Sequence, residues 1–128
     1  MAFSNRLMSE AFVASVDLNT SQFHIVDLST AAHKVTIGAA AGGYGIVQNK
    51  PLAGEHATVA IHGASKCIAG AAIAVGDYIT SAASGYASVV TSGGSTKKVI
   101  GRAVTAAASG SVFTVEIDRF VSAATLAI

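Results

Sequence analysis

The strongest constraint on the fold is the regular recurrence of turn-forming residues along the chain. Glycine, serine and aspartate separate short runs of strand formers about every 8 to 12 residues, a spacing typical of sandwiches and barrels. These runs are rich in valine, isoleucine, threonine and aromatic residues. They cover residues 22–28, 33–38, 44–49, 55–63, 65–70, 76–82, 86–90, 97–107 and 111–120. The sequence therefore predicts an all-β fold, a small single-domain β-barrel or sandwich of short strands.

Two of the runs alternate between apolar and polar positions, as half-buried strands do. The apolar positions are Ala57, Val59 and Ile61 in the first of these runs and Phe113, Val115 and Ile117 in the second. Gly63 interrupts the first run and predicts a bulge or a kink there. The stretch 67–75 has some helical character, but Gly70 and its β-branched residues weaken a helical interpretation.

Charge is unusually scarce in this sequence. Asp, Glu, Lys and Arg make up 12% of the 128 residues, against about 25% in typical soluble domains. A net charge of +1 predicts neither a basic face for nucleic acid nor an acidic tail. No run approaches the roughly 20 apolar residues of a membrane-spanning helix, and the hydrophobicity is too high for a disordered chain. We therefore expect copies of the chain, or a partner, to cover part of its surface.

Targeting and redox signals are weak. Glu10 interrupts the N-terminal apolar stretch where a signal peptide would need an unbroken core. Cys67 is the only cysteine, so no intrachain disulfide can form, and it is expected to be a small buried hydrophobic residue. These features favour a protein that is not exported through an oxidising compartment.

The glycine cluster within residues 38–51, "GAAAGGYGIVQNKP", invites comparison with phosphate-binding loops. A Walker-type loop needs a lysine directly after its last glycine, and Tyr44 follows Gly43. The dinucleotide fingerprint needs a third glycine three residues after the second, and Gln48 stands there after Gly45. We therefore predict a structural segment, in which glycines allow positive φ or let another backbone approach closely.

The histidines do not form a metal-binding pattern. His56 and His62 share one face of a strand but lie about 20 Å apart, far more than ligands at about 2.0 to 2.1 Å from one ion allow. We expect His24, His33, His56 and His62 to be scattered surface or interface residues. No G-x-S-x-G motif or paired carboxylates are present either. The sequence predicts no metal, no cofactor and no enzymatic activity, although an active site assembled from distant residues stays open.

Four blocks of sequence, in order, carry a resemblance to a known family. They are "GIVQNKPLAGEHATVAIHGASK", "AGAAIAVGDYITSAASGYA", "VIGRAVTAAASG" and "FTVEI", within residues 35–117. In this order they resemble the small capsid cement (head decoration) proteins of tailed bacteriophages. Turns and kinks are expected at the positions that fit the resemblance and in the glycine cluster. These positions are Gly43, Gly45, Asn49, Pro51, Gly54, Gly76, Asp77, Gly85 and Gly101.

The resemblance implies a structural role on a virus particle. Such proteins sit on the outer surface of an icosahedral phage head, commonly as homotrimers. They bridge neighbouring major capsid protein subunits and stabilise the DNA-filled shell. The resemblance implies that the chain is made in the host bacterial cytoplasm and is located in the virion, with no nucleic-acid or membrane partner. A receptor- or carbohydrate-binding module of the head surface is the alternative, although the chain offers only three tyrosines and no tryptophan as aromatic platforms.

Both ends of the chain are richer in apolar residues than mobile tails usually are. We expect an N-terminal arm over residues 1–20, a β domain over 21–118 and an apolar C-terminal segment over 119–128. At least one end is expected to pack on a neighbouring subunit or on the capsid. The candidate interface residues are Phe3, Leu7, Met8, Phe12, Phe120, Val121, Leu126 and Ile128. The alternative is that the ends pack on their own domain.

Overall fold

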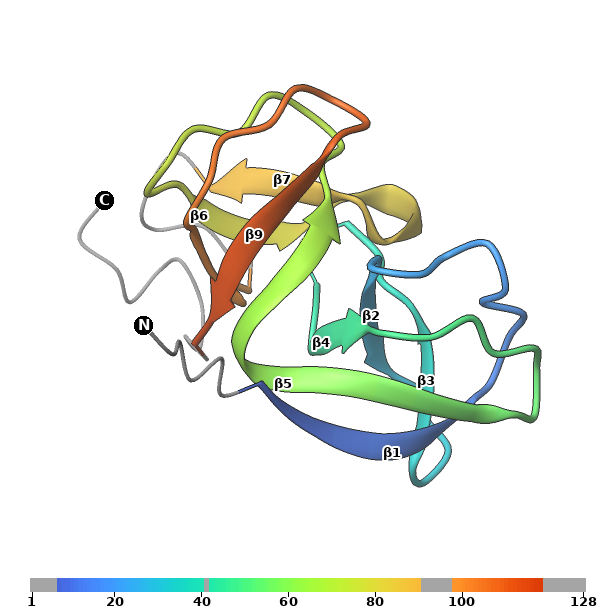
Figure 1. Ribbon diagram of the computed structural model, residues 1–128. Coiled ribbons are helices and arrows are strands. Elements are labelled where there is room, and N and C mark those ends of the chain that lie inside the picture. Colours follow the sequence, from blue (N-terminus) through green and yellow to red (C-terminus); the bar gives the residue numbers. More distant parts are fainter. Residues whose placement is uncertain (1–6, 41, 91–97, 119–128) are drawn as a thin grey trace.

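A computed structural model describes residues 7–40, 42–90 and 98–118, and this part of the chain is built almost entirely of strands (Figure 1). The strands are β1 (Met8–Ala14), β2 (Ile25–Leu28), β3 (Lys34–Ile37), β4 (Gly45–Val47), β5 (His56–Ile68), β6 (Tyr78–Ser81), β7 (Ala87–Val90), β8 (Gly101–Ala103) and β9 (Val112–Ile117). One short 3-10 turn, η1 (Ala83–Gly85), separates β6 from β7. The all-β prediction is confirmed.

The first five strands close into a small barrel. Their order is β1-β3-β2-β4-β5, and β1 also pairs with β5, which completes the ring. All neighbours are antiparallel except β1 and β3, which run parallel. Closure leaves none of these strands with a free edge. Of the two architectures that the sequence predicted, the structure has the barrel.

The remaining strands form a second half beside the barrel, in the order β5-β9-β8-β6-β7. All of these pairings are antiparallel. A parallel bridge between Ala69 and Ala87 links the start of β7 to the residue after β5, so this half also curls back on itself. The long strand β5 therefore belongs to both halves, as Figure 1 shows.

The predicted kink at Gly63 is the point where β5 passes from one half to the other. Its residues up to His62 pair with β1, and those from Gly63 onward pair with β9. Gly63 has φ +100°, a conformation that glycine adopts without the steric penalty of a Cβ. Figure 1 shows β5 bending sharply between the halves, while the strand remains continuous.

The barrel interior receives apolar side chains from each of its five strands. This cluster comprises Phe12, Ala14, Leu18, Val26, Val35, Val47, Ala57 and Val59. The strands turn every second residue inward, as the pleat requires. The phenyl ring of Phe12 meets Tyr44 edge-on, with ring centroids 5.8 Å apart.

A second core joins the barrel to the other half. Ile25, Ile46 and Ala60 project from the outside of the barrel into this cluster. The other half contributes Cys67, Ala69, Ile73, Ile79, Ala87, Ile100, Ala103, Phe113, Val115 and Ile117. The alternation of β5 puts Ala60 on the side of the strand opposite Val59, which is the outer face of the barrel. Ala60 is nevertheless buried, because the second half of the molecule covers this part of the outer face. The shared core makes the two halves one domain.

The predicted N-terminal arm over residues 1–20 is wrong for its described part. Strand β1 pairs with β5 over six residue pairs and also with β3. Phe12 and Leu18 are buried in the barrel core. The backbone N–H of Leu18 donates to the carbonyl of Pro51 at 2.9 Å. Residues 8–18 therefore belong to the β domain, because the barrel cannot close without β1.

Candidate functional site

Four of the nine predicted turn residues are glycines with positive φ. Gly43, Gly54, Gly76 and Gly85 have φ values of +132°, +87°, +89° and +75°. At Gly54 and Gly76 the chain turns immediately before β5 and β6. Gly85 closes the η1 turn. These glycines shape connections and expose no reactive group.

Gly45 and Gly101 lie inside strands and not in turns. A Cβ at Gly45 would lie 2.5 Å from the carbonyl oxygen of Ala60, and one at Gly101 would overlap the carbonyl oxygen of Glu116. Both glycines therefore let neighbouring strands approach closely, which is the second role expected for glycines in this chain.

Asn49, Pro51 and Asp77 fix loops through hydrogen bonds. The side chain of Asn49 accepts from the N–H of Thr58 at 3.0 Å and donates to the carbonyl of His56 at 2.9 Å. Asp77 accepts from the N–H of Ala74 at 2.8 Å. Pro51 is buried. These contacts position the loops before β5 and β6.

The candidate interface residues separate into three groups. Phe12 is buried in the protein's own core, which corresponds to the alternative that the ends pack on their own domain. Met8 is 58% exposed, and Leu7 packs partly against the second core. The others lie outside the described residues, namely Phe3, Phe120, Val121, Leu126 and Ile128.

The most distinctive surface is formed by two loops together and was not predicted from the sequence. We call residues 69–76 and 104–111 the double loop, and it lies at the top of Figure 1. The two segments contain no charged residue. Val75 is 68% exposed and Val104 is 49% exposed. Exposed alanines occupy both segments, namely Ala71, Ala72, Ala74, Ala106 and Ala108. A charge-free surface of small apolar side chains suits close packing against another protein.

Backbone hydrogen bonds tie the two segments of the double loop together. Ile73 and Ala107 exchange both of their backbone hydrogen bonds, at 2.8 and 3.0 Å. Ala69 donates to the carbonyl of Ser111 at 2.9 Å and accepts from Gly110 at 2.7 Å. The side chain of Ile73 is buried in the second core. The double loop is therefore anchored along its length, so ordering it on binding costs little conformational entropy.

Charged residues lie at the foot of the double loop. Arg102, Glu116 and Asp118 line a shallow cleft of about 250 Å³ together with Val75 and Val104. The Arg102 guanidinium lies over the Tyr78 ring, 4.9 Å from its centroid. Its Nε donates to the carbonyl of Gly76 at 3.2 Å. An apolar centre beside a polar rim is the usual arrangement of a protein interface.

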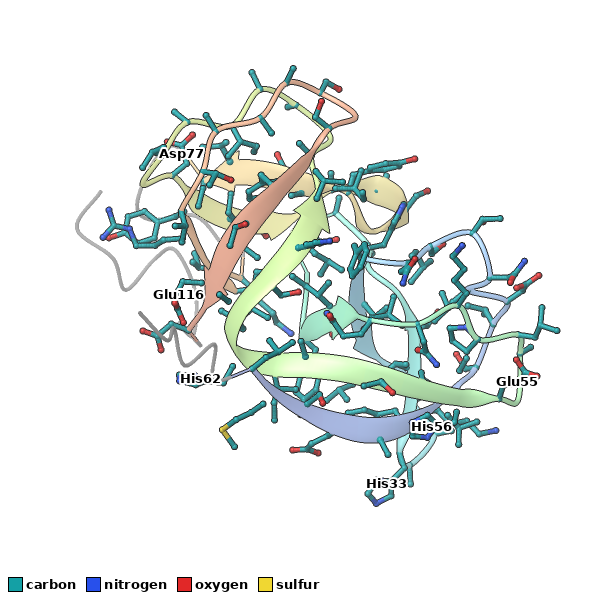
Figure 2. The ribbon with its side chains drawn as sticks, viewed as in Figure 1. His33, Glu55, His56, His62, Asp77 and Glu116 are labelled. Atoms are coloured by element: carbon teal, nitrogen blue, oxygen red, sulfur yellow. The ribbon has the colours of Figure 1, made fainter. Side chains whose placement is uncertain are left out.

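Of the other side chains labelled in Figure 2, Asp77 lies beside the double loop, where its carboxylate accepts from the N–H of Ala74. Glu55, His56 and His33 are at the far end of the barrel, and His62 lies where the two halves meet. All four side chains are exposed. The double loop itself thus carries no charge, and charged groups lie at its foot and at the far end of the barrel.

His24 departs from the prediction of a surface or interface imidazole. It is buried, and its Nδ1–H donates to the carbonyl of Ser84 at 2.8 Å. The ring is covered because η1 folds back over β2, an approach that local sequence does not reveal. His33, His56 and His62 are exposed, as predicted.

Neither a metal centre nor a reactive thiol is found in the described part of the chain. Among residues 7–40, 42–90 and 98–118 no three His, Cys, Asp or Glu side chains gather as a metal site would require. Burial raises the pKa of the Cys67 thiol to about 12, so this thiol stays neutral and is a poor nucleophile. Cys67 is fully buried, as predicted. Within the same ranges, no helix could cross a membrane.

Comparison with known proteins places the chain in a family. Residues 19–119 match the phage cement protein family. The chain belongs to this family. This match includes every strand of the cement protein except β1. No curated protein matches the sequence.

A solved structure with a similar fold comes from bacteriophage phi29. It is described as the head fiber gp8.5 N base, and it superposes on the cement protein with a TM-score of 0.69. The similarity covers 90% of this chain and 97% of the phi29 chain at 22% sequence identity. At this identity the likeness shows a shared fold. Membership of the cement protein family indicates a structural protein that associates with a phage capsid.

Proposed function

We propose that this protein is a capsid cement protein that binds the outer surface of an icosahedral phage head. It bridges neighbouring major capsid protein subunits and stabilises the DNA-filled shell. The observation that carries this proposal is the charge-free double loop, a rigid apolar surface on a chain of the cement protein family.

The chemistry of the double loop supports a contact that resists changes of salt. Salt screens exposed charges beyond a Debye length of about 10 Å at 0.1 M, and the double loop has none. Its alanines, glycines and serines let a facing backbone approach closely. The valines Val75 and Val104 supply larger apolar contacts. The contact therefore depends on shape and on apolar burial.

Bridging explains how a small protein strengthens a large shell. An interface of about 800 Å² on each partner gives affinities from micromolar to picomolar, depending on packing. A protein that contacts two subunits at once gains further through effective concentration. The complete site exists only where subunits meet, so assembled shells bind the protein far better than free subunits do.

We also propose that the isolated chain self-associates, as a homotrimer. The low charged fraction of 12% supports association, because little repulsion opposes contact between copies. The apolar residues outside the described ranges, among them Phe3, Phe120 and Leu126, then act as arms that contact neighbouring subunits. Sedimentation at micromolar concentration is expected to show a species three times the mass of the chain. A monomer that also fails to assemble on the shell would contradict this proposal.

The decisive experiment compares phage particles with and without the protein. DNA-filled particles that carry it are expected to survive heating and osmotic shock that rupture bare particles. Isolated capsid subunits serve as the second binding target and are expected to bind weakly. Equal survival of the two preparations would contradict the proposal that the protein stabilises the shell. Tight binding to free subunits would indicate an assembly chaperone.

A further inference from the structure

A polar cleft close to the double loop has none of the double-loop residues in its lining. It has a volume of about 340 Å³, at the lower end of the range of about 300–1,000 Å³ typical of ligand sites. It lies between the segment that follows β1 and the η1 turn. Its polar lining residues are Asp17, Thr20, Ser21, His24, Ser84 and Tyr86.

Tyr86 separates this cleft from a second hollow. Its side chain is 38% exposed. It lines both the polar cleft and a neighbouring hollow formed with Gly70, Ser109 and Gly110. The Tyr86 side chain therefore borders both hollows, and it is more exposed than Tyr44 and Tyr78.

His24 and Gly70 both lie against the Tyr86 side chain. The His24 ring packs against it with centroids 4.6 Å apart and an angle of 54° between the planes. The hydrogen bond from His24 to the carbonyl of Ser84 fixes the imidazole in turn. A Cβ at Gly70 would lie 2.7 Å from the Cβ of Tyr86, so the glycine leaves room for the ring. A platform fixed in this way is organised before any ligand arrives.

Several polar groups of the cleft have no protein partner within the described residues. They are the hydroxyls of Thr20, Ser21, Ser84 and Tyr86 and the Nε2 atom of His24. The hydroxyls of Ser15 and Ser81, which lie outside the cleft, each donate to a backbone carbonyl at 2.9 Å. The cleft thus offers donors and acceptors to a ligand.

Of the three described non-glycine residues with positive φ, namely Phe23, His33 and Ser84, two lie beside the same cleft. Phe23 and Ser84 have φ values of +66° and +61°, a region that non-glycine residues rarely adopt. Phe23 precedes His24 in sequence, and Ser84 accepts the His24 hydrogen bond. Such strain persists where the surrounding structure enforces it, and it gathers at binding sites.

We propose that this cleft binds an uncharged saccharide, with one pyranose ring lying on Tyr86. A pyranose has an apolar face of C–H groups that suits an aromatic ring and a rim of hydroxyls that both donate and accept hydrogen bonds. The hydroxyls of the cleft do the same, and the Asp17 carboxylate accepts from sugar hydroxyls. The carboxylate also disfavours anionic ligands such as phosphate.

The test is a titration of the full-length protein, followed by nuclear magnetic resonance, with maltotriose and with the trisaccharide of N-acetylglucosamine. Saturable shifts of the amide signals of His24, Ser84 and Tyr86 are expected at millimolar concentration with at least one of the two. Tyr86→Ala is expected to weaken binding by about tenfold or more, because the stacking surface is lost. Tyr86→Phe keeps the ring and is expected to stay within about threefold of the parent protein.

Thr20→Ala tests the hydroxyl contribution without disturbing the fold, because the Thr20 side chain is exposed and bonds to no described residue. It is expected to weaken binding by about threefold or more. Flat titrations with both trisaccharides would overturn the proposal, and so would equal affinities of the parent, Tyr86→Ala and Thr20→Ala proteins. Loss of capsid attachment in Tyr86→Ala, with flat titrations, would show that the cleft is a protein interface. Capsid attachment through the double loop is measured separately, so either role can fail alone.

Discussion

Replacing Phe12 by alanine is expected to lower the free energy of unfolding by about 3 to 5 kcal/mol, the usual cost of removing a buried phenyl ring. Phe12 is 6% exposed and meets Tyr44 edge-on inside the barrel. Truncation leaves a cavity at the point where β1 closes the ring of strands. Urea denaturation followed by circular dichroism measures the change.

Met8 provides a matched control on the same strand. It is 58% exposed, so Met8→Ala is expected to change the stability by no more than about 0.5 kcal/mol. Together the two variants distinguish two possibilities for β1: that it is a strand of the isolated barrel, or that it is an arm that becomes ordered only on a partner. If Phe12→Ala unfolded at the same urea concentration as the parent chain, β1 would not contribute to the isolated domain.

The position of β1 shows what the sequence could not predict. The runs 55–63 and 111–120 alternate clearly, and the strands β5 and β9 begin within them. In β1 only Phe12 and Ala14 are buried, and its first four residues are exposed, so its pattern resembles a free segment. Its place depends on pairing with β5 and, in parallel, with β3. Pairing between distant segments leaves little trace in local sequence.

The candidate surfaces were only partly predictable for the same reason. The absence of charge from residues 67–76 and 103–115 is visible in the sequence. Their alignment is not, because it depends on the bridge between Ile73 and Ala107. His24 likewise sits in a strand-forming run, and its burial results from the distant η1 turn.

Placing a negative charge on the double loop is expected to abolish capsid attachment without unfolding the protein. Ala72→Asp and Ala108→Glu change exposed side chains of the double loop that do not line the cleft of Arg102, so both variants are expected to fold normally. In the bound state the new carboxylate is buried against the capsid without a partner. An uncompensated buried charge costs about 3 to 5 kcal/mol, which corresponds to a loss of affinity of about 100-fold or more. Co-sedimentation of the variants with DNA-filled particles measures this loss.

Leu52→Asp is the matched control for these variants. Leu52 is 47% exposed and lies in the loop of Glu55, whose side chain accepts from its N–H at 2.8 Å. It therefore introduces the same charge on an exposed apolar residue at the opposite end of the molecule (Figure 2). Normal attachment of Leu52→Asp, with loss in both double-loop variants, assigns the capsid contact to the double loop. Equal attachment of all three would exclude the double loop, whereas equal loss would show that added negative charge weakens attachment wherever it is placed. Added salt separates these cases, since screening restores binding lost to long-range repulsion and does little for a carboxylate buried in the contact.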